Sequence, residues 1–211
     1  MDTQQLTAAL AHSLPVNLLV ASPGSYRGPV GSYSHFNEAV SAEPGIHGKS
    51  RNWGDINQSG QRQIVAQILN ESTRAGLTLG EAAFALAVAR TESGFNPDAA
   101  SGISSAAGIG QFLDSTNRGF GVADSERFSA ATNIRAMLHY LRQTLAAARK
   151  KGAGASAEQV WTRAFALYHD GPQLHAGGAQ IAQKQVVPWA ERYADWLCGA
   201  LSQKTPQVRA A

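Results

Sequence analysis

The sequence predicts a mainly α-helical protein, and three observations support this fold class. Apolar residues recur at helical spacing in several segments, capping residues stand at the starts of these segments, and no run resembles a core strand. At 211 residues the chain can form one sizeable core. We therefore predict a single globular helical domain at residues 56–203, an irregular N-terminal arm at residues 1–55 and a C-terminal tail at residues 204–211.

The predicted helices follow from apolar faces that are bounded by start and stop signals. In chain order we expect helices between Ser59 and Gly76, between Thr78 and Gly94, at residues 130–150, between Ser156 and Gly171, and from Pro188 onward. Residues 94–128 are rich in Gly and Ser, and we expect loops there around a short helix at residues 106–113. Within the arm, the leucine spacing of residues 1–20 predicts one short amphipathic helix.

One acidic residue, Glu92, lies at the end of the most apolar predicted helix. Residues 81–89 contain no polar side chain other than Glu81, which is typical of a helix buried on most sides, and Gly94 can end this helix. A carboxyl that leaves a dry core loses hydration, so its pKa rises, as a general acid near neutral pH requires. The alternative is that Glu92 only pairs with a neighbour such as Arg90.

Composition and charge limit the classes of function without selecting one. The net charge of +3 and the pI near 9.2 favour anionic surroundings such as nucleic acid, a phosphate-rich membrane or an acidic cell-wall polymer. The six histidines lack the spacing of a metal site, and neither a Walker loop nor a nucleophile elbow occurs. We expect no metal and no cofactor. The single cysteine, Cys198, excludes an internal disulfide framework, and we expect it to be buried beside Leu197.

The N-terminal sequence lacks the features of a secretory signal. No Lys or Arg precedes Arg27, and Pro15 and Asn17 interrupt the apolar residues 14–21. No stretch approaches the roughly 18 to 20 apolar residues of a membrane span. We expect a protein that is made in the cytoplasm without a cleavable signal and that does not insert stably into a membrane.

Several polar residues that a helical fold could gather around Glu92 lie in short motifs. These candidate site residues are Ser93, Gln111, Thr116, Tyr168 and Asp170. The motifs are Glu-Ser-Gly-Phe-Asn-Pro at residues 92–97, Ala-Ala-Gly-Ile-Gly-Gln-Phe at 106–112, Asn-Ile-Arg-Ala at 133–136 with Tyr-Leu at 140–141, and Tyr-His-Asp-Gly-Pro at 168–172. Their order along the chain resembles that of the SLT-type lytic transglycosylases, relatives of goose-type lysozyme that cleave peptidoglycan.

This resemblance implies a lysozyme-like domain in which Glu92 is the single catalytic acid/base. It places Ser93 beside Glu92, lets Gln111 and Thr116 bind sugar in the groove, and lets Tyr168 contact the catalytic carboxyl or the substrate. The implied reaction cleaves the bond between N-acetylmuramic acid and N-acetylglucosamine and leaves 1,6-anhydro ends. The implied partners are peptidoglycan glycan strands, and we expect a monomer that does not bind nucleic acid.

Some positions depart from the usual pattern of that family. They are Ser105 for Gly, Gly110 for Met, Asp114 for Pro, Met137 for Gly, and His169-Asp170 for Asn-Ala. Asp170 could be only a turn residue before Gly-Pro. Alternatively, Asp170 or another aspartate, at Asp98, Asp114 or Asp124, could position a water opposite Glu92, and the outcome would be hydrolysis as in goose-type lysozyme.

Two alternatives of other classes remain at this point, an inactive wall-binding structural module and a nucleic-acid-binding helical protein. The first predicts wall binding without released fragments, and the second predicts salt-sensitive DNA binding. A wall-degrading enzyme without an export signal fits a phage lysin, a virion component or a secreted effector that acts in the periplasm or cell wall. Of these three settings we favour the phage lysin.

Overall fold

The computed structural model describes residues 3–21, 53–175 and 177–204, and it confirms the mainly α-helical fold. These residues contain no strand, only isolated β-bridges that join Ala107 to Ala100 and to Phe112. The helical elements are α1 (Thr3–His12), η1 (Val16–Leu18), α2 (Gln58–Arg74), α3 (Leu79–Ser93), α4 (Asp114–Gly119), η3 (Asp124–Glu126), α5 (Ala130–Lys151), α6 (Ala157–Asp170), η4 (Gly171–Gln173), α7 (Gly178–Ile181), the π-helical η5 (Ala182–Val186) and α8 (Val187–Lys204).

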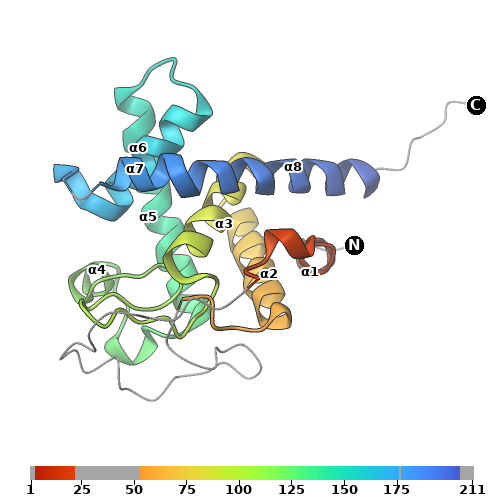
Figure 1. The fold of residues 1–211 in the computed structure, drawn as a ribbon, viewed down its shortest axis with the longest axis horizontal. Helices are drawn as coiled ribbons and strands as arrows, with labels where there is room; N and C mark the ends of the chain where they lie inside the picture. The colour runs from red at the N-terminus through yellow and green to blue at the C-terminus, as the bar shows by residue number, and fades with distance from the viewer. Residues whose placement is uncertain (1–2, 22–52, 176, 205–211) are drawn as a thin grey trace, which may run out of the picture.

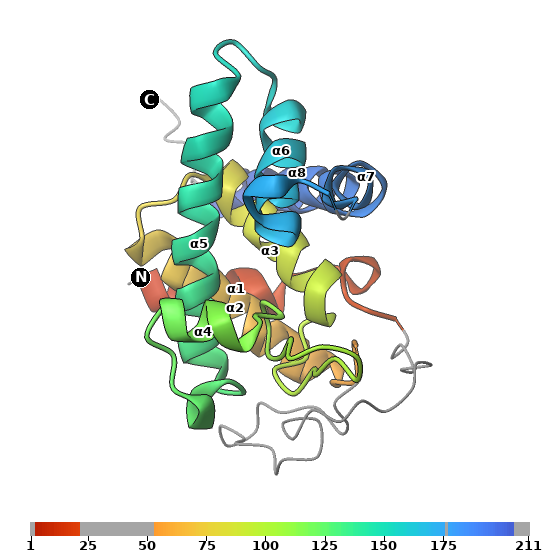
Figure 2. The ribbon, with the colours of Figure 1, turned by 90° about the vertical axis from the view of Figure 1, so that its left-hand side faces the viewer.

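Helix α3 is the central element of the domain. It packs along α8 and against α2, while α5 packs against α2 and α6. Figures 1 and 2 show α8 lying across the long helix α5 at a steep angle, and the loops between α3 and α5 below α8. The long helices all contribute to one continuous cluster of buried hydrophobic residues. The predicted single helical domain is thus confirmed.

The two ends of α3 explain why this helix carries Glu92 out of the core. At its start, Thr78 and Glu81 form the predicted capping box, each side chain accepting the backbone N–H of the other residue. At its end, Gly94 has a left-handed φ of 61°. Residues 82–90 are all buried, so the helix contacts protein on every side. Glu92 lies in the last turn, where the helix leaves this core.

The first residues of the predicted arm form part of the core. The short amphipathic helix expected within residues 1–20 is confirmed as α1, which packs against α2. Leu10 and Leu14 are buried, and Gln61 of α2 bonds through its side chain to both the N–H and the carbonyl of Val20. Residues 3–21 therefore belong to the helical domain. The rest of the expected arm, residues 22–52, lies outside the described residues.

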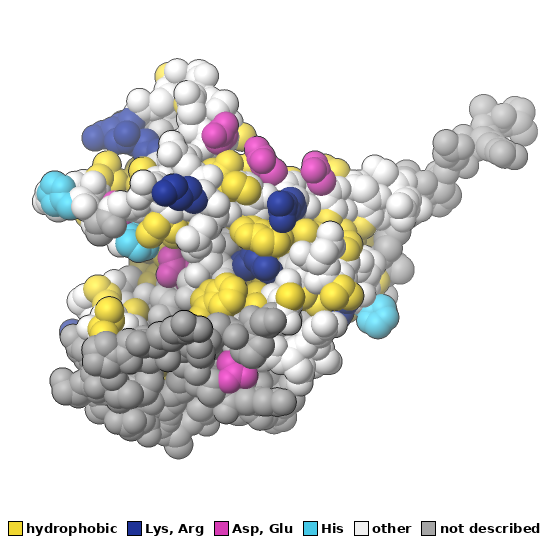
Figure 3. All heavy atoms as spheres, viewed as in Figure 1, with side chains coloured by type: hydrophobic (Ala, Val, Ile, Leu, Met, Phe, Trp, Pro, Cys, Tyr) yellow, Lys and Arg dark blue, Asp and Glu magenta, His cyan; other side chains and the backbone are white. Residues whose placement is uncertain are grey.

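A second contact ties the N-terminal segment to α3 and α8. The carbonyl of Leu18 accepts hydrogen bonds from Arg90 Nη1 at 3.0 Å and from the Tyr193 hydroxyl at 2.8 Å. The guanidinium of Arg90 also lies 3.6 Å from the ring centre of Trp189, and that of Arg192 lies 4.7 Å from it. Figure 3 shows basic side chains among hydrophobic ones on the face that α8 crosses.

The loop before α4 differs from the prediction. A short helix was expected at residues 106–113, but the short helix is α4, directly after them. Gly108 has a φ of 79° and Gln111 a φ of 50°, whereas a right-handed helix needs negative φ. Residues 106–113 therefore form a turn that the two β-bridges close.

The C-terminal helix and the cysteine also differ from the predictions. Pro188 does not open a helix, because α7, η5 and α8 follow one another without a break and Pro188 lies inside this run. Proline lacks a backbone donor and crowds the preceding turn, and the wider π turn of η5 accommodates it. The prediction that Cys198 is buried was wrong. Cys198 is exposed because the buried position of this turn is taken by Leu197.

Candidate active site

Glu92 is the residue around which the candidate site is built. It is partly exposed in the last turn of α3, and burial by the surrounding protein raises the pKa of its carboxyl to about 8. Desolvation alone causes this shift, so no cation among the described residues holds the carboxyl ionised. Arg90 does not pair with it, because Arg90 bonds to Leu18 and stacks on Trp189. At neutral pH the Glu92 carboxyl is therefore protonated.

The segment at Trp53 and Gly54 fixes the backbone of the turn that carries this acid. The indole Nε1–H of Trp53 donates to the carbonyls of Arg90 and Thr91 at 2.9 and 3.1 Å. The N–H of Gly54 donates to the carbonyl of Ser93 at 2.8 Å. The last carbonyls of a helix have no partner within the helix, so these bonds satisfy them and hold the turn in place.

A groove of about 460 Å³ opens beside Glu92, within the roughly 300–1,000 Å³ that ligand clefts usually have. It lies between the end of α3, the loop before α4, and the end of α6. Five of the six residues predicted for the site line it, namely Glu92, Gln111, Thr116, Tyr168 and Asp170. The lining combines aromatic rings with hydroxyl, amide and carboxyl groups, a mixture that suits the apolar faces and hydroxyl edges of a sugar.

Ser93 is the predicted site residue that the structure does not bring to the groove. Its side chain is fully buried, and its hydroxyl donates to the carbonyl of Ala89 at 2.9 Å within α3. Its predicted place among the substrate-binding residues therefore has no support in this geometry, and Ser93 instead contributes to packing at the end of α3.

Tyr168 forms the aromatic wall of the groove together with Tyr140 and Phe112. The ring of Tyr168 lies 5.1 Å from that of Tyr140 and 5.7 Å from that of Phe112, centre to centre. Burial raises the pKa of Tyr168 well above its ordinary value, and the negative charge of ionised Glu92 raises this pKa further. Tyr168 consequently stays neutral, and the effect of Glu92 on its pKa indicates that its phenol group lies near the Glu92 carboxyl.

The Tyr168 hydroxyl also explains the glycine at position 110. It donates to the carbonyl of Gly110 at 2.6 Å, so its proton is already used within the protein. A Cβ at Gly110 would lie 2.7 Å from this hydroxyl oxygen, which is closer than real contacts allow. The glycine therefore makes room for a bond that joins α6 to the loop before α4.

Gln111 shapes this loop as well as lining the groove. Its amide Nε2 donates to the carbonyls of Ala99 and Gly108 at 3.1 and 2.9 Å. The loop is anchored from α5 by the buried Asn133, which accepts the N–H of Gly110 at 2.7 Å and donates to the carbonyl of Arg127 at 3.2 Å. Among the described residues, the Gln111 amide oxygen is left as an acceptor for a ligand.

Asp170 lines the groove, but its carboxylate already has protein partners. Only 2% of the side chain is exposed, and both of its oxygens accept the N–H of Gly178, at 3.0 and 3.1 Å. Oδ1 also lies 2.6 Å from Nδ1 of His169. Asp170 is thus more than a turn residue, because it connects the end of α6 to the start of α7 and to His169.

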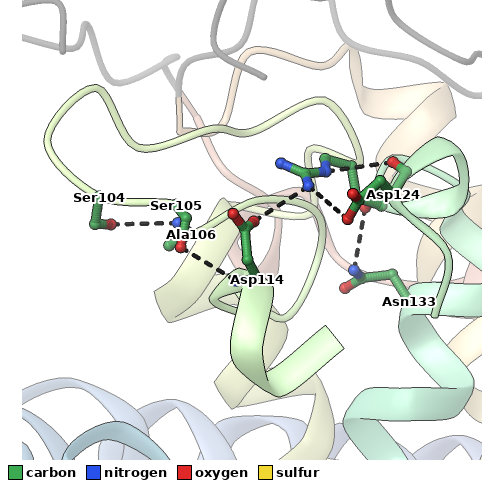
Figure 4. A network of polar contacts seen from close by, with 7 residues as sticks. Ser104, Ser105, Ala106, Asp114, Asp124 and Asn133 are labelled. Atoms are coloured by element: carbon green, nitrogen blue, oxygen red, sulfur yellow. Dashed lines mark hydrogen bonds and ion pairs between the residues drawn. The ribbon is translucent and has the colours of Figure 1, made fainter. Parts of the chain in front are cut away.

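The other aspartates considered for a second catalytic role do not line the groove. Asp98 is fully buried. Asp114 and Asp124 form ion pairs with the same guanidinium, that of Arg127, at 3.1 and 3.0 Å, and Figure 4 shows this network beside the loop at Ser105. The network also includes the bond from the N–H of Asp114 to the Ser105 hydroxyl at 3.1 Å. These groups stabilise the loop and its junction with α4.

His169 lines the groove but was not among the site residues predicted from the sequence. Its side chain is 32% exposed, it lines the same groove as Glu92, and its ring packs against Phe165 at 5.8 Å between centres. From sequence alone it was one of six scattered histidines. The available signal was the His-Asp pair directly after Tyr168, where the related family usually has Asn-Ala.

Over the described residues the domain is all-helical, and its groove combines a protonated carboxyl with polar and aromatic side chains, as expected for the lysozyme-like domains that the sequence motifs resemble. The family model described as Transglycosylase SLT domain matches residues 78–185, just over half of the chain, and the protein belongs to this family. The resemblance inferred from the sequence motifs is therefore confirmed, and membership implies a transglycosylase-type activity on peptidoglycan. No curated protein and no solved structure matches the chain.

Two further findings concern the described residues only. Their His, Cys, Asp and Glu side chains form no group of three or more that could hold a metal ion. None of their helices is long and apolar enough to cross a bilayer.

Proposed function

We propose that the protein is a lytic transglycosylase that cleaves the bond between N-acetylmuramic acid and N-acetylglucosamine with Glu92 as its single acid/base. The observation that carries this proposal is the Glu92 carboxyl, whose pKa is raised to about 8 and which lies on the groove. A general acid must hold its proton at the working pH and must reach solvent, and Glu92 meets both requirements. Family membership supplies the substrate class.

The reaction uses this carboxyl twice. In the first half, the Glu92 proton passes to the glycosidic oxygen as the bond between that oxygen and the muramoyl C1 breaks. In the second half, the Glu92 carboxylate takes the proton of the C6 hydroxyl as the C6 oxygen attacks C1. The product has a 1,6-anhydromuramoyl end, no water is consumed, and Glu92 regains its proton. The raised pKa of Glu92 favours both transfers, because it keeps the acid protonated and makes the carboxylate a stronger base.

Three other groove residues are proposed to bind the glycan strand. The amide oxygen of Gln111 accepts a hydrogen bond from a sugar hydroxyl or acetamido N–H, and the Thr116 hydroxyl offers both a donor and an acceptor. The Tyr168 ring provides an apolar surface for a sugar ring, while its hydroxyl proton is held by Gly110. Together with Glu92, these groups lie on three sides of one groove.

The hydrogen bonds and ion pairs that the aspartates already make favour a mechanism with one acid over hydrolysis assisted by an aspartate. Asp114 and Asp124 pair with Arg127, and Asp170 is held by Gly178 and His169. A carboxylate whose oxygens already accept hydrogen bonds from these partners has fewer lone pairs free to position a water in the groove. We therefore place transglycosylation ahead of hydrolysis by Asp170.

The test is the Glu92→Gln variant on purified cell walls, with Glu126→Gln as control because Glu126 is exposed on η3 outside the groove. We expect Glu92→Gln to keep the fold and to lose at least about 100-fold in the rate of wall clearing, the range that loss of a general acid usually causes. Glu126→Gln should keep the wild-type rate. Clearing by Glu92→Gln at the wild-type rate would contradict the proposal.

The alternative functions predict different results in this assay, in the analysis of its products and in a DNA-binding assay. If the wild-type protein sediments with walls but releases no soluble fragments, it is a wall-binding structural module. Mass spectrometry of released fragments separates anhydro ends from reducing ends, and so separates transglycosylation from hydrolysis. DNA binding that weakens steeply with salt would favour the nucleic-acid alternative.

For the biological setting we propose that the protein acts on the cell wall as a phage lysin. The peptidoglycan substrate implied by the family and the net charge of +3, which suits an anionic wall, support action at the wall. Expression in bacteria with and without a pore-forming protein tests the lysin role. Lysis only in the presence of the pore supports a phage lysin, whereas delivery that needs a secretion apparatus supports an effector.

A further inference from the structure

The His169–Asp170 pair is built like the base and its orienting acid in many active sites. The imidazole Nδ1 lies 2.6 Å from Oδ1 of Asp170, which is a short, charge-assisted distance. The Asp170 carboxylate is itself held by the N–H of Gly178 at both oxygens, and it is almost fully buried. A base that hydrogen-bonds to a fixed third group is the arrangement that activates nucleophiles in unrelated enzymes.

The packing around the pair leaves one ring nitrogen of His169 available. An ionised carboxylate only accepts hydrogen bonds, so Nδ1 carries the proton that it donates to Asp170, and in the neutral imidazole this tautomer leaves the lone pair on Nε2. The ring rests on Phe165, and no described residue bonds to Nε2. A Cβ at Gly178 would lie 2.8 Å from Oδ1 of Asp170, so the glycine allows this close approach of α7.

We propose that His169, oriented by Asp170, activates water in the groove for a competing hydrolysis, so that the protein releases reducing ends in addition to the anhydro ends that Glu92 forms without His169. The proposal rests on the proposed function of Glu92 as the acid that opens the glycosidic bond. Asp170 cannot take this role directly, because its carboxylate is buried and partnered, whereas the His169 ring is 32% exposed and lines the groove. The pair thus presents an imidazole in place of the aspartate that the hydrolytic alternative required.

The hydrolytic step consumes one water and uses both Glu92 and His169. The bond between C1 and the leaving oxygen breaks, its electron pair goes to that oxygen, and the oxygen takes the proton of Glu92. The water oxygen forms a new bond to C1, and Nε2 of His169 takes one water proton. His169 then releases this proton to solvent while Glu92 takes one from solvent, so one water is consumed in each cycle.

Product partition in the full-length protein tests this proposal. Cell walls are first reduced with borohydride, so that any new reducing end arises during the digestion, and new ends are then tagged with borodeuteride. Mass spectrometry counts tagged ends and anhydro ends in the same sample. For the wild-type protein we expect both kinds of end.

The variant His169→Asn restores the residue type that the related family usually has at this position. We expect it to lower the ratio of tagged to anhydro ends at least tenfold while the rate of anhydro formation stays within threefold of the wild type. His12→Asn is the matched control, because His12 is exposed at the end of α1 and does not line the groove, and it should leave the ratio unchanged. A structural effect of His169→Asn would lower both products together.

A second variant tests the base function of the imidazole itself. His169→Ala should lose the tagged ends, and added imidazole should restore them without changing the anhydro ends. The proposal is overturned if the wild type forms no tagged ends, or if His169→Asn leaves the ratio within twofold of the wild type. Failure of the proposed function has a different result, because then neither product forms or both persist in Glu92→Gln.

Discussion

The two sides of the groove are held in place by different means. The helical side consists of the ends of α3 and α6, which supply Glu92 and Tyr168 and continue into the buried core. The loop side consists of residues 99–113, which supply Gln111 and have little regular structure. Many apolar contacts hold the helical side, whereas a few hydrogen bonds and two left-handed residues give the loop side its shape.

This difference predicts how each side responds to change. The position of Glu92 depends on many buried side chains of α3 and on the bonds from Trp53 and Gly54, so the loss of one contact leaves the others in place. The loop depends on single residues such as Gly108 and Asn133, each of which has no substitute. The catalytic acid therefore lies on the helical side, which tolerates the loss of single contacts. Ligand binding depends on the loop side, where single residues cannot be replaced.

The largest effect on stability is expected for Gly108→Ala. Gly108 has a φ of 79°, and a Cβ there would lie 2.4 Å from the Asn133 amide nitrogen and 2.5 Å from the Arg127 carbonyl oxygen. Left-handed strain and overpacking together should lower the free energy of unfolding by about 2–4 kcal/mol and disturb the bond between Asn133 and Gly110. Urea unfolding measures the loss, and wall clearing should slow in parallel.

Gly154→Ala is the control for backbone strain alone. Gly154 has a similar φ of 83°, but a Cβ there would meet nothing within 4 Å. We expect a loss of about 1 kcal/mol with unchanged activity. Equal losses of unfolding free energy for the two variants would show that the contact with Asn133 does not stabilise the loop. The loop side would then tolerate substitution as well as the helical side does.

The next effect concerns the pH dependence of stability on the helical side. Unfolded Glu92 releases its proton near pH 4.5, whereas folded Glu92 keeps it until about pH 8. The stability associated with the neutral carboxyl is complete below pH 4.5 and is lost as the pH rises to about 8, because over this range the unfolded state gains free energy by releasing the proton while the folded state keeps it. Over this range the wild type should lose on the order of a few kcal/mol of unfolding free energy through this group.

Glu92→Gln removes this titration, so it should become more stable than the wild type as the pH rises. Urea unfolding of both proteins at pH 5 and pH 8.5 measures the difference, and other titrating groups cancel in the comparison. Parallel pH curves for the two proteins would mean that Glu92 is solvated in the folded state. Glu92 would then not be a buried general acid.

The helical side could be predicted from sequence for the same physical reason that makes it robust. The capping box at Thr78, the apolar run after it and the stop at Gly94 are local signals, and they placed α3 and the raised pKa of Glu92 correctly. α1, α5 and α6 were likewise indicated by local spacing and caps. Local signals determine where a helix begins and which of its faces is buried.

The loop side depends on contacts between distant residues, and sequence spacing does not reveal them. The turn at residues 106–113 depends on Asn133, which lies in another helix, and the sequence instead indicated a short helix there. The burial of Ser93 and the orientation of His169 by Asp170 also follow from tertiary packing. For Cys198, a difference of one position along the helix separates the buried Leu197 from the exposed cysteine.

The smallest predicted effect tests the bond that joins the two sides directly. Tyr168→Phe removes the hydroxyl that donates to the Gly110 carbonyl at 2.6 Å and leaves a buried carbonyl without its partner, which should cost about 1–2 kcal/mol. The KM for soluble glycan fragments should rise severalfold because the loop is less well held, while kcat stays close to the wild type because Glu92 does not move.

Tyr140→Phe is the matched control, since its hydroxyl makes a longer bond of 3.3 Å to Leu167, which joins two helices and leaves the loop untouched. If Tyr140→Phe raises KM as much as Tyr168→Phe, the bond between the sides does not set the shape of the loop. The loop is then held by its other bonds, among them those of Gln111 and Asn133.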